Sequence, residues 1–134
     1  MTKYLLIALL LFTSFAFSQS VEKTELIGLW NVVNVESTRE IKKEEKEMLD
    51  MAKKAFMNST FEFESNENFT LNIDFIGIGE KLKKVYWNYS SDDSSITIES
   101  WNEHDNLMVI IVEKKNDTVF FKLRETSLTL EVEK

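Results

Sequence analysis

The sequence predicts an all-β protein with one helix, in which eight antiparallel strands run up and down and close into a barrel. Two observations lead to this fold class. After residue 58, apolar and polar residues alternate in seven successive runs, and each run is short enough for a single strand. One further β-branched run precedes the amphipathic helical pattern. Eight antiparallel strands remove their exposed edges best when the sheet closes on itself.

The N-terminal residues have the pattern of a secretion signal. Lys3 supplies a positive charge, an apolar run follows it, and the small residues Ala16 and Ser18 precede an expected cleavage before Gln19. The apolar run is too short for a permanent membrane span. The chain has no cysteine, so we expect neither a lipid anchor at the cleavage site nor a disulfide.

We therefore expect a signal peptide at 1–18 and a single domain at 19–134, secreted or located in the periplasm. The formal net charge of the whole chain is −7. A negative charge argues against nucleic acid and against an anionic membrane surface as partners. No membrane span is expected in the mature chain.

The first strand is predicted over Leu26–Glu36. Valines in this run favour a pleated, half-buried surface. Two faces compete for the interior, one with Trp30 and Val32 and the other with Val33 and Val35. The pattern does not decide between them.

An amphipathic helix of about five turns is predicted next, over Ser37–Asn58. Ser37 and Glu40 fit a capping box at its start, and Asn58 can end it in a left-handed conformation. The apolar residues form one stripe, at Ile41, Met48, Ala52, Ala55 and Phe56.

The connections between the later strands differ in kind. Those at 65–68, 90–94 and 114–117 are short and rich in Asn, Asp and Ser, which predicts tight hairpins at one end of the barrel. The helix and the loops at 76–80 and 102–106 fall at the other end, which we expect to be open. The later strands are STFEFES (59–65), FTLNIDF (69–75), KLKKVYWNY (81–89), SITIESW (95–101), LMVIIVEK (107–114), TVFFKLR (118–124) and SLTLEVEK (127–134).

Gly28-Leu29-Trp30, near the start of the first strand, resembles the Gly-x-Trp signature of lipocalins, in which the tryptophan plugs the closed end of the barrel. The order of helix, MNSTFEFESNENFTLNI, VYWNYSSDDSSITI and SLTLEVEK is similar to short lipocalin-like domains of exported Bacteroidetes proteins, over Glu25–Lys134. The chain departs from larger lipocalins because no helix follows the barrel. The resemblance implies a lipocalin-like barrel with Gly28 and Trp30 at its floor, and only loosely a ligand.

The expected binding site is the mouth and interior of this barrel. Ile76 and Ile78 either form an apolar lip or continue the strand beneath the helix, and the helix stripe is either a lid or core. Eight-stranded barrels are either filled by their own side chains or hold one small ligand. The candidate ligand-binding residues are Met48, Phe56, Phe63, Leu71, Ile73, Ile76, Ile78 and Trp87.

We expect no catalytic or metal site and no cofactor. His104 is the only histidine, and its neighbours Glu103 and Asp105 lack the spacing of zinc ligands. Consecutive side chains of an extended segment point in opposite directions, so the three are expected to form a solvated acidic loop. Asp92 and Asp93 are expected to form a turn.

Two functions remain after these exclusions. In the first, the exported barrel binds a small apolar molecule in its interior without catalysis. In the alternative, a packed barrel acts as an interaction or inhibitor module for a protein of the cell envelope. A monomer is expected in both cases.

Overall fold

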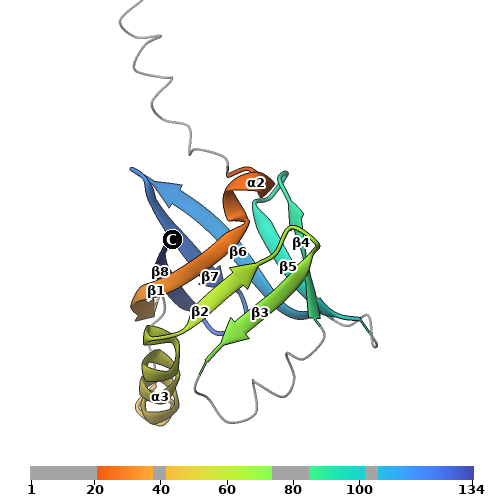
Figure 1. Ribbon diagram of the computed structural model, residues 1–134. Coiled ribbons are helices and arrows are strands. Elements are labelled where there is room, and N and C mark those ends of the chain that lie inside the picture. The colour runs from red at the N-terminus through yellow and green to blue at the C-terminus, as the bar shows by residue number, and fades with distance from the viewer. Residues whose placement is uncertain (1–20, 38–41, 74–84, 102–105) are drawn as a thin grey trace, which may run out of the picture.

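The protein is an eight-stranded antiparallel barrel, as the sequence predicts. The computed structural model describes residues 21–37, 42–73, 85–101 and 106–134. Each strand pairs with the next strand in the chain, and the last strand pairs with the first (Figure 1). The predicted signal peptide lies outside the described residues.

The described chain contains two helices and eight strands. A short helix, α2 (Lys23–Leu26), leads into β1 (Gly28–Ser37), and helix α3 (Lys46–Met57) follows. The remaining strands are β2 (Thr60–Phe63), β3 (Asn68–Asn72), β4 (Val85–Ser90), β5 (Ser95–Ser100), β6 (Asn106–Lys115), β7 (Thr118–Leu123) and β8 (Leu128–Glu133).

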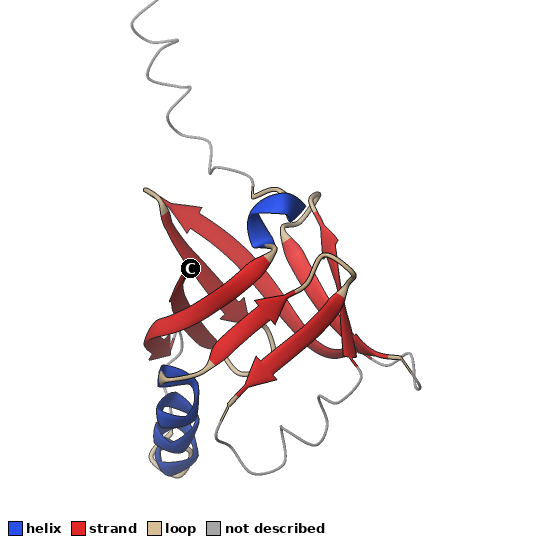
Figure 2. Ribbon diagram, in the orientation of Figure 1, coloured by secondary structure: helices blue, strands red, loops and turns tan. Residues whose placement is uncertain are grey.

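The two ends of the barrel differ in the way that the sequence predicts. The β2–β3, β4–β5 and β6–β7 hairpins lie at the same end as α2, which we call the hairpin end (Figure 2). Helix α3 extends from the opposite end, which we call the helix end. In the β6–β7 hairpin, Asn116 and Asp117 both have positive φ, 49° and 69°, between the paired residues Lys115 and Thr118. This is the two-residue turn whose twist matches that of its strands.

A bulge in β1 explains why the sequence pattern does not decide which face of this strand points into the barrel. Val32 pairs with Val132 and Asn34 with Glu131, so Val33 is an extra residue in β1. Before the bulge, Trp30 and Val32 face the interior; after it, Val35 packs against the core. Both candidate faces are therefore used in turn, because the bulge reverses the phase of the strand.

The first strand begins later than predicted. Leu26 belongs to α2, where its side chain is fully buried, and β1 starts at Gly28. A helix of four residues is too short to produce a periodic pattern in the sequence.

The predicted bounds of the long helix also need correction. Ser37 pairs with Leu128 as the last residue of β1, and α3 starts only at Lys46, so Ser37 is not the N-cap of α3. At the other end, Asn58 has φ −115° and is not left-handed. The Ser59 hydroxyl donates instead to the Phe56 carbonyl, at 2.6 Å, which satisfies one of the carbonyls at the helix end.

Candidate functional site

The floor of the barrel is built around Trp30 at the hairpin end. Its buried indole N–H donates to the carbonyl of Leu26 in α2, with a distance of 2.9 Å. The ammonium group of Lys134 lies 5.1 Å from the indole ring centre and donates to the Ile27 carbonyl at 2.8 Å. These contacts hold α2 and the start of β1 over the end of the barrel.

Gly28 fits this floor because of its backbone conformation. Its φ is +134°, which side-chain-bearing residues rarely adopt. A Cβ atom at this position would also lie 3.4 Å from Cε of Lys134. The structure thus places both Gly28 and Trp30 at the closed end, where the lipocalin resemblance expects them.

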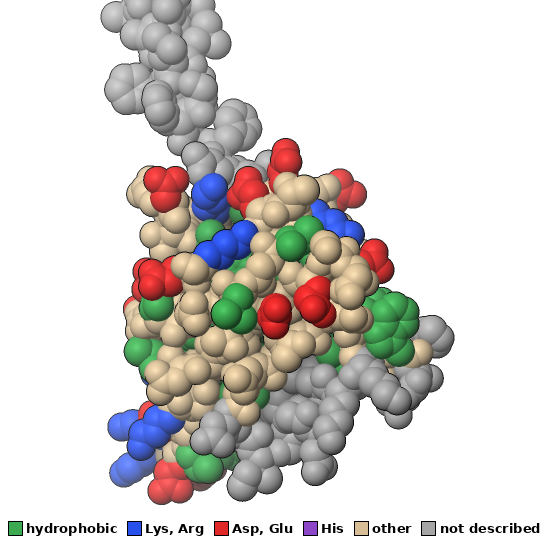
Figure 3. All heavy atoms as spheres, viewed as in Figure 1, with side chains coloured by type: hydrophobic (Ala, Val, Ile, Leu, Met, Phe, Trp, Pro, Cys, Tyr) green, Lys and Arg blue, Asp and Glu red, His purple; other side chains and the backbone are tan. Residues whose placement is uncertain are grey.

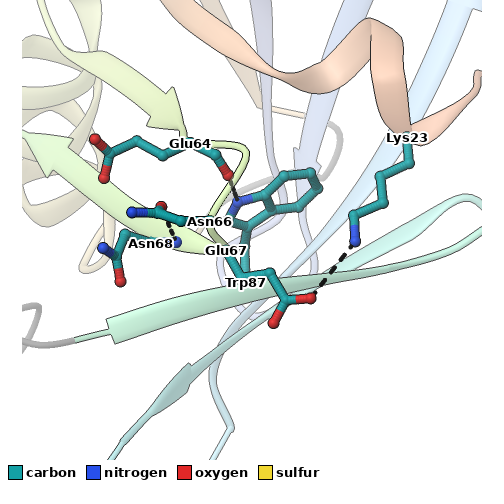
Figure 4. A network of polar contacts seen from close by, with 6 residues as sticks. All are labelled: Lys23, Glu64, Asn66, Glu67, Asn68 and Trp87. Atoms are coloured by element: carbon teal, nitrogen blue, oxygen red, sulfur yellow. Dashed lines mark hydrogen bonds and ion pairs between the residues drawn. The ribbon is translucent and has the colours of Figure 1, made fainter.

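Trp87 belongs to the hairpin end as well. Its indole N–H donates to the Glu64 carbonyl, at 2.9 Å, in the β2–β3 hairpin (Figure 4). Lys23 of α2 lies over its ring, at 5.3 Å from the centre, and 3.7 Å from a carboxylate oxygen of Glu67. Trp87 is fully buried and contacts both the β2–β3 hairpin and Lys23 of α2, so it links these two elements.

An aromatic layer fills the barrel above this floor. Phe121 of β7 contacts rings from the far side of the barrel, with centroid distances of 5.6 Å to Trp30, 5.6 Å to Phe61 and 5.9 Å to Phe63. Phe63 also contacts Trp87, at 5.2 Å. Strands β7 and β2 are not neighbours in the sheet, so these side chains meet across the interior. At this level the interior is packed by the protein itself.

Apolar side chains at the helix end are less completely covered. Six of them are partly exposed and pack against the buried core; we call them the helix-end set. They come from β1, α3, the residue after β3 and the start of β6, and are Val35, Leu49, Ala52, Ile73, Leu107 and Met108. Phe56 of α3 is buried and stacks on Phe61, with centroids 6.4 Å apart. The α3 stripe is thus joined to the aromatic layer through Phe56.

The predicted ligand-binding residues separate into different environments. Phe63 and Trp87 lie in the aromatic layer and at the hairpin end, and Leu71 is buried. Ile73 belongs to the helix-end set, while Met48 of α3 is 75% exposed. Phe56 connects α3 to the core. Ile76 and Ile78 lie outside the described residues, as does His104.

A pocket opens in the outer wall where β4 begins, and we call it the wall pocket. Its volume is about 410 Å³, and its lining residues are Glu64, Asn68, Phe69, Thr70, Val85 and Trp101. Trp101 follows β5 and is 49% exposed. Its indole packs on the ring of Tyr86, with centroids 4.3 Å apart. Tyr86 donates a hydrogen bond to Glu99, and this bond raises the pKa of the phenol.

The phase of Trp101 along its strand is a signal in the sequence for an exposed aromatic residue. Ile96 and Ile98 of β5 are buried, and Trp101 has the opposite phase. A large aromatic residue in the outward phase of a strand is unusual, because such side chains contribute most when buried. Tyr86 has the outward phase in β4, between the buried residues Val85 and Trp87.

The described residues contain neither a metal-binding group nor a membrane-spanning helix. No group of three or more His, Asp or Glu side chains in those ranges could hold a metal ion. No described helix has the length and apolar character needed to cross a membrane. Comparison with known proteins found no match: no protein family, curated protein or solved structure matches this chain.

Proposed function

We propose that the protein is a non-catalytic binding protein that takes up a small apolar molecule at the helix end of its barrel. The observation that carries this proposal is the helix-end set. Of the partly buried apolar side chains packed against the core, most lie at this end, whereas α2 and the hairpins cover the other. Partly exposed apolar side chains gathered at one end of a barrel offer contact area to a small apolar molecule.

The aromatic layer limits how deep such a molecule could enter. Phe61, Phe63 and Phe121 are fully buried and in contact across the interior, so a ligand would rest on this layer. Ile73 and Leu107 would then contact it. Ile73 follows β3 and Leu107 lies in β6, which are the strands on either side of the β4–β5 pair. The expected ligand is small and is held mainly by apolar contact, with a free energy proportional to the apolar area that it covers.

A dye titration tests this proposal. Phenylnaphthylamine is neutral and apolar, and its fluorescence rises when it leaves water. We expect saturable binding to the wild type and an affinity about tenfold lower in Ile73→Ser and Leu107→Ser, since each removes apolar contact worth about 1–3 kcal/mol. Leu29→Ser is the matched control, because Leu29 is 48% exposed on β1, near the other end.

Either of two results would overturn the proposal. The first is the absence of saturable binding to the wild type. The second is an equal loss in the Leu29→Ser control, which would show that the dye reports general surface hydrophobicity. Native mass spectrometry of protein isolated from its own host would then identify any bound molecule by a mass that is lost on denaturation.

A second candidate function is the binding of a protein partner of the cell envelope. The observation in its favour is that Met48 and Met51 of α3 are 75% and 61% exposed. Methionine adapts to irregular apolar surfaces and is common at adaptable interfaces. Crosslinking in an envelope extract tests it: a product that forms with the wild type should be lost in Met51→Glu, while dye binding should remain.

We propose further that the protein acts outside the cytoplasm and that its barrel is of the lipocalin-like kind. The secretion pattern of residues 1–18 and the position of Trp30 beneath α2 support these two statements. Intact-mass measurement of the protein from culture medium and periplasm tests the first, since the mature chain should begin at Gln19. A chain that keeps residues 1–18 would contradict export by cleavage.

A further inference from the structure

We infer that the wall pocket is a second binding site, separate from the helix-end set, and that it takes a neutral saccharide. The pocket lies where β3, β4 and the end of β5 come together. Thr70 follows Phe69, which pairs with Val85, the first residue of β4. On the other side, Val85 pairs with Ser100, and Trp101 follows. Thr70 and Trp101 therefore flank the start of β4.

The pocket has the size of a small-molecule site. Its volume of about 410 Å³ falls within the range of such pockets, about 300–1,000 Å³. Its apolar lining is supplied by Phe69 and Val85, which are core residues and are almost completely buried. Because both side chains are fixed by the core, this part of the pocket is preformed.

Trp101 provides a flat aromatic surface beside the pocket. One part of the indole packs against Tyr86, and about half of the residue remains exposed. Tyr86 is itself held by its hydrogen bond to Glu99, on the neighbouring strand. The contact with Tyr86 thus restrains the indole. A restrained, exposed aromatic ring suits stacking against the C–H face of a pyranose ring.

The polar lining of the pocket suits hydroxyl groups. Glu64 accepts hydrogen bonds, Asn68 both donates and accepts them, and the Thr70 hydroxyl does the same. Sugar hydroxyls also donate and accept, so neighbouring hydroxyls can pair with such a mixed set. Figure 3 shows both acidic and basic side chains on this face of the barrel, with a hydrophobic patch at its edge, where β4 and β5 reach the helix end.

The charge of the lining decides between classes of ligand. Among the described residues, the lining includes one carboxylate, Glu64, and no basic side chain. Phosphorylated or sulfated ligands would meet the negative charge of Glu64. An organic cation would prefer several aromatic faces around it, whereas the lining offers one exposed indole together with an amide and a hydroxyl. A neutral saccharide uses all of these groups.

Nuclear magnetic resonance of the indole N–H groups tests the inference on the full domain. The chain has three tryptophans, and those of Trp30 and Trp87 are bonded to backbone carbonyls. The Trp101 indole signal is assigned from its absence in Trp101→Phe. The probes are the methyl glycosides of glucose, galactose, mannose and N-acetylglucosamine, with tetramethylammonium chloride for the cation and glucose phosphate for the anion.

We expect at least one neutral glycoside to shift the Trp101 signal saturably, with little change at Trp30 and Trp87. Trp101→Ala and Glu64→Gln should each weaken binding about tenfold or more, as measured from ligand-detected spectra. Trp101→Phe should recover part of the affinity, because it keeps an aromatic face. Glu47→Gln, on α3, is the matched control for the loss of one carboxylate and should bind as the wild type does.

The following results would overturn the inference. They are no shift with any neutral glycoside, a saturable shift with tetramethylammonium or glucose phosphate alone, and glycoside binding that persists unchanged in Trp101→Ala. Folding of each variant is checked by its thermal unfolding midpoint. The replaced side chains lie on the surface, and midpoints near that of the wild type are expected.

Discussion

Phe121→Ala is the replacement that most directly tests whether the barrel interior is packed by its own side chains. Phe121 is fully buried, and its ring meets those of Trp30, Phe61 and Phe63 across the interior. Removing a buried phenylalanine side chain costs about 3–5 kcal/mol, since burial is lost and a cavity is left. The lost aromatic contacts place Phe121 in the upper part of that range. A domain of this size has a total stability of about 5–15 kcal/mol, so the variant should lose a large part of its free energy of unfolding.

Urea unfolding, monitored by circular dichroism, measures this cost. The comparison requires that the unfolding free energy of both proteins has the same dependence on urea concentration. Phe120→Ala is the matched control, because Phe120 lies next in the same strand and faces outward, opposite Glu131 of β8. It should cost about 1 kcal/mol or less. A loss below about 1 kcal/mol in Phe121→Ala would refute the reasoning, since it would mean that the aromatic layer does not fill the interior.

The remaining predictions concern single contacts. Trp30→Phe should cost about 1–3 kcal/mol, because the Leu26 carbonyl loses its buried donor; an unchanged thermal midpoint would contradict this. Asn116→Ala should cost about 1 kcal/mol in urea unfolding, since alanine tolerates the left-handed backbone of the turn less well, and a stabilised variant would speak against the turn geometry. The hydrogen bond from Lys122 lowers the pKa of Glu113 from its ordinary value of 4.5. Desolvation opposes this shift, and a hydrogen bond from Lys115 makes a smaller contribution that also lowers the pKa. The folded pKa thus lies below the unfolded one, so Glu113 stabilises the fold above pH 4.5, and this contribution is lost as the pH falls through the folded pKa. The stability difference between the wild type and Glu113→Gln should shrink on acidification, and a constant difference in unfolding free energy would exclude this linkage.

The number and order of the strands could be predicted because the alternation is regular. In most strands after α3, every second residue is buried, as with Phe61 and Phe63 or with Leu128, Leu130 and Val132. Strand β6 is an exception, since the consecutive residues Val109 and Ile110 are both buried. The hairpins could be placed at one end because their residues favour turns and because an up-and-down order alternates between ends. No tertiary information is needed for either step.

The bounds of β1 and α3 could not be predicted, because tertiary pairing decides them. Ser37 carries a helix-start signal, yet it pairs with Leu128, a strand partner ninety-one residues further along the chain. The bulge at Val33 has no signal of its own, since apolar residues on both faces of a strand fit either phase. Tertiary pairing between β1 and β8 overrides the local conformational preference of these residues.

The candidate sites were predictable to different degrees. The floor at Gly28 and Trp30 was expected from the lipocalin resemblance, and the helix-end position of Ile73 from the order of the strands. Trp87 was expected at the mouth or in the interior; it is buried toward the hairpin end, and its position along β4 depends on the register with β5. The wall pocket was not foreseen, because it depends on three strands coming together at Trp101.

The pairing of β1 with β8 has a consequence for how the protein folds. The barrel closes only when its first and last strands meet, and the Lys134 ammonium group bonds to Ile27 over a sequence separation of 107 residues. During folding, β1 can pair with β2 but has no partner for its other edge until β8 reaches it. Because this closure brings distant segments together at a high entropic cost, we expect folding to be slow, in milliseconds to seconds, with barrel closure as a late step. Until then, two strand edges are open to pairing with other chains, and the pairing of β8 with β1 removes them both.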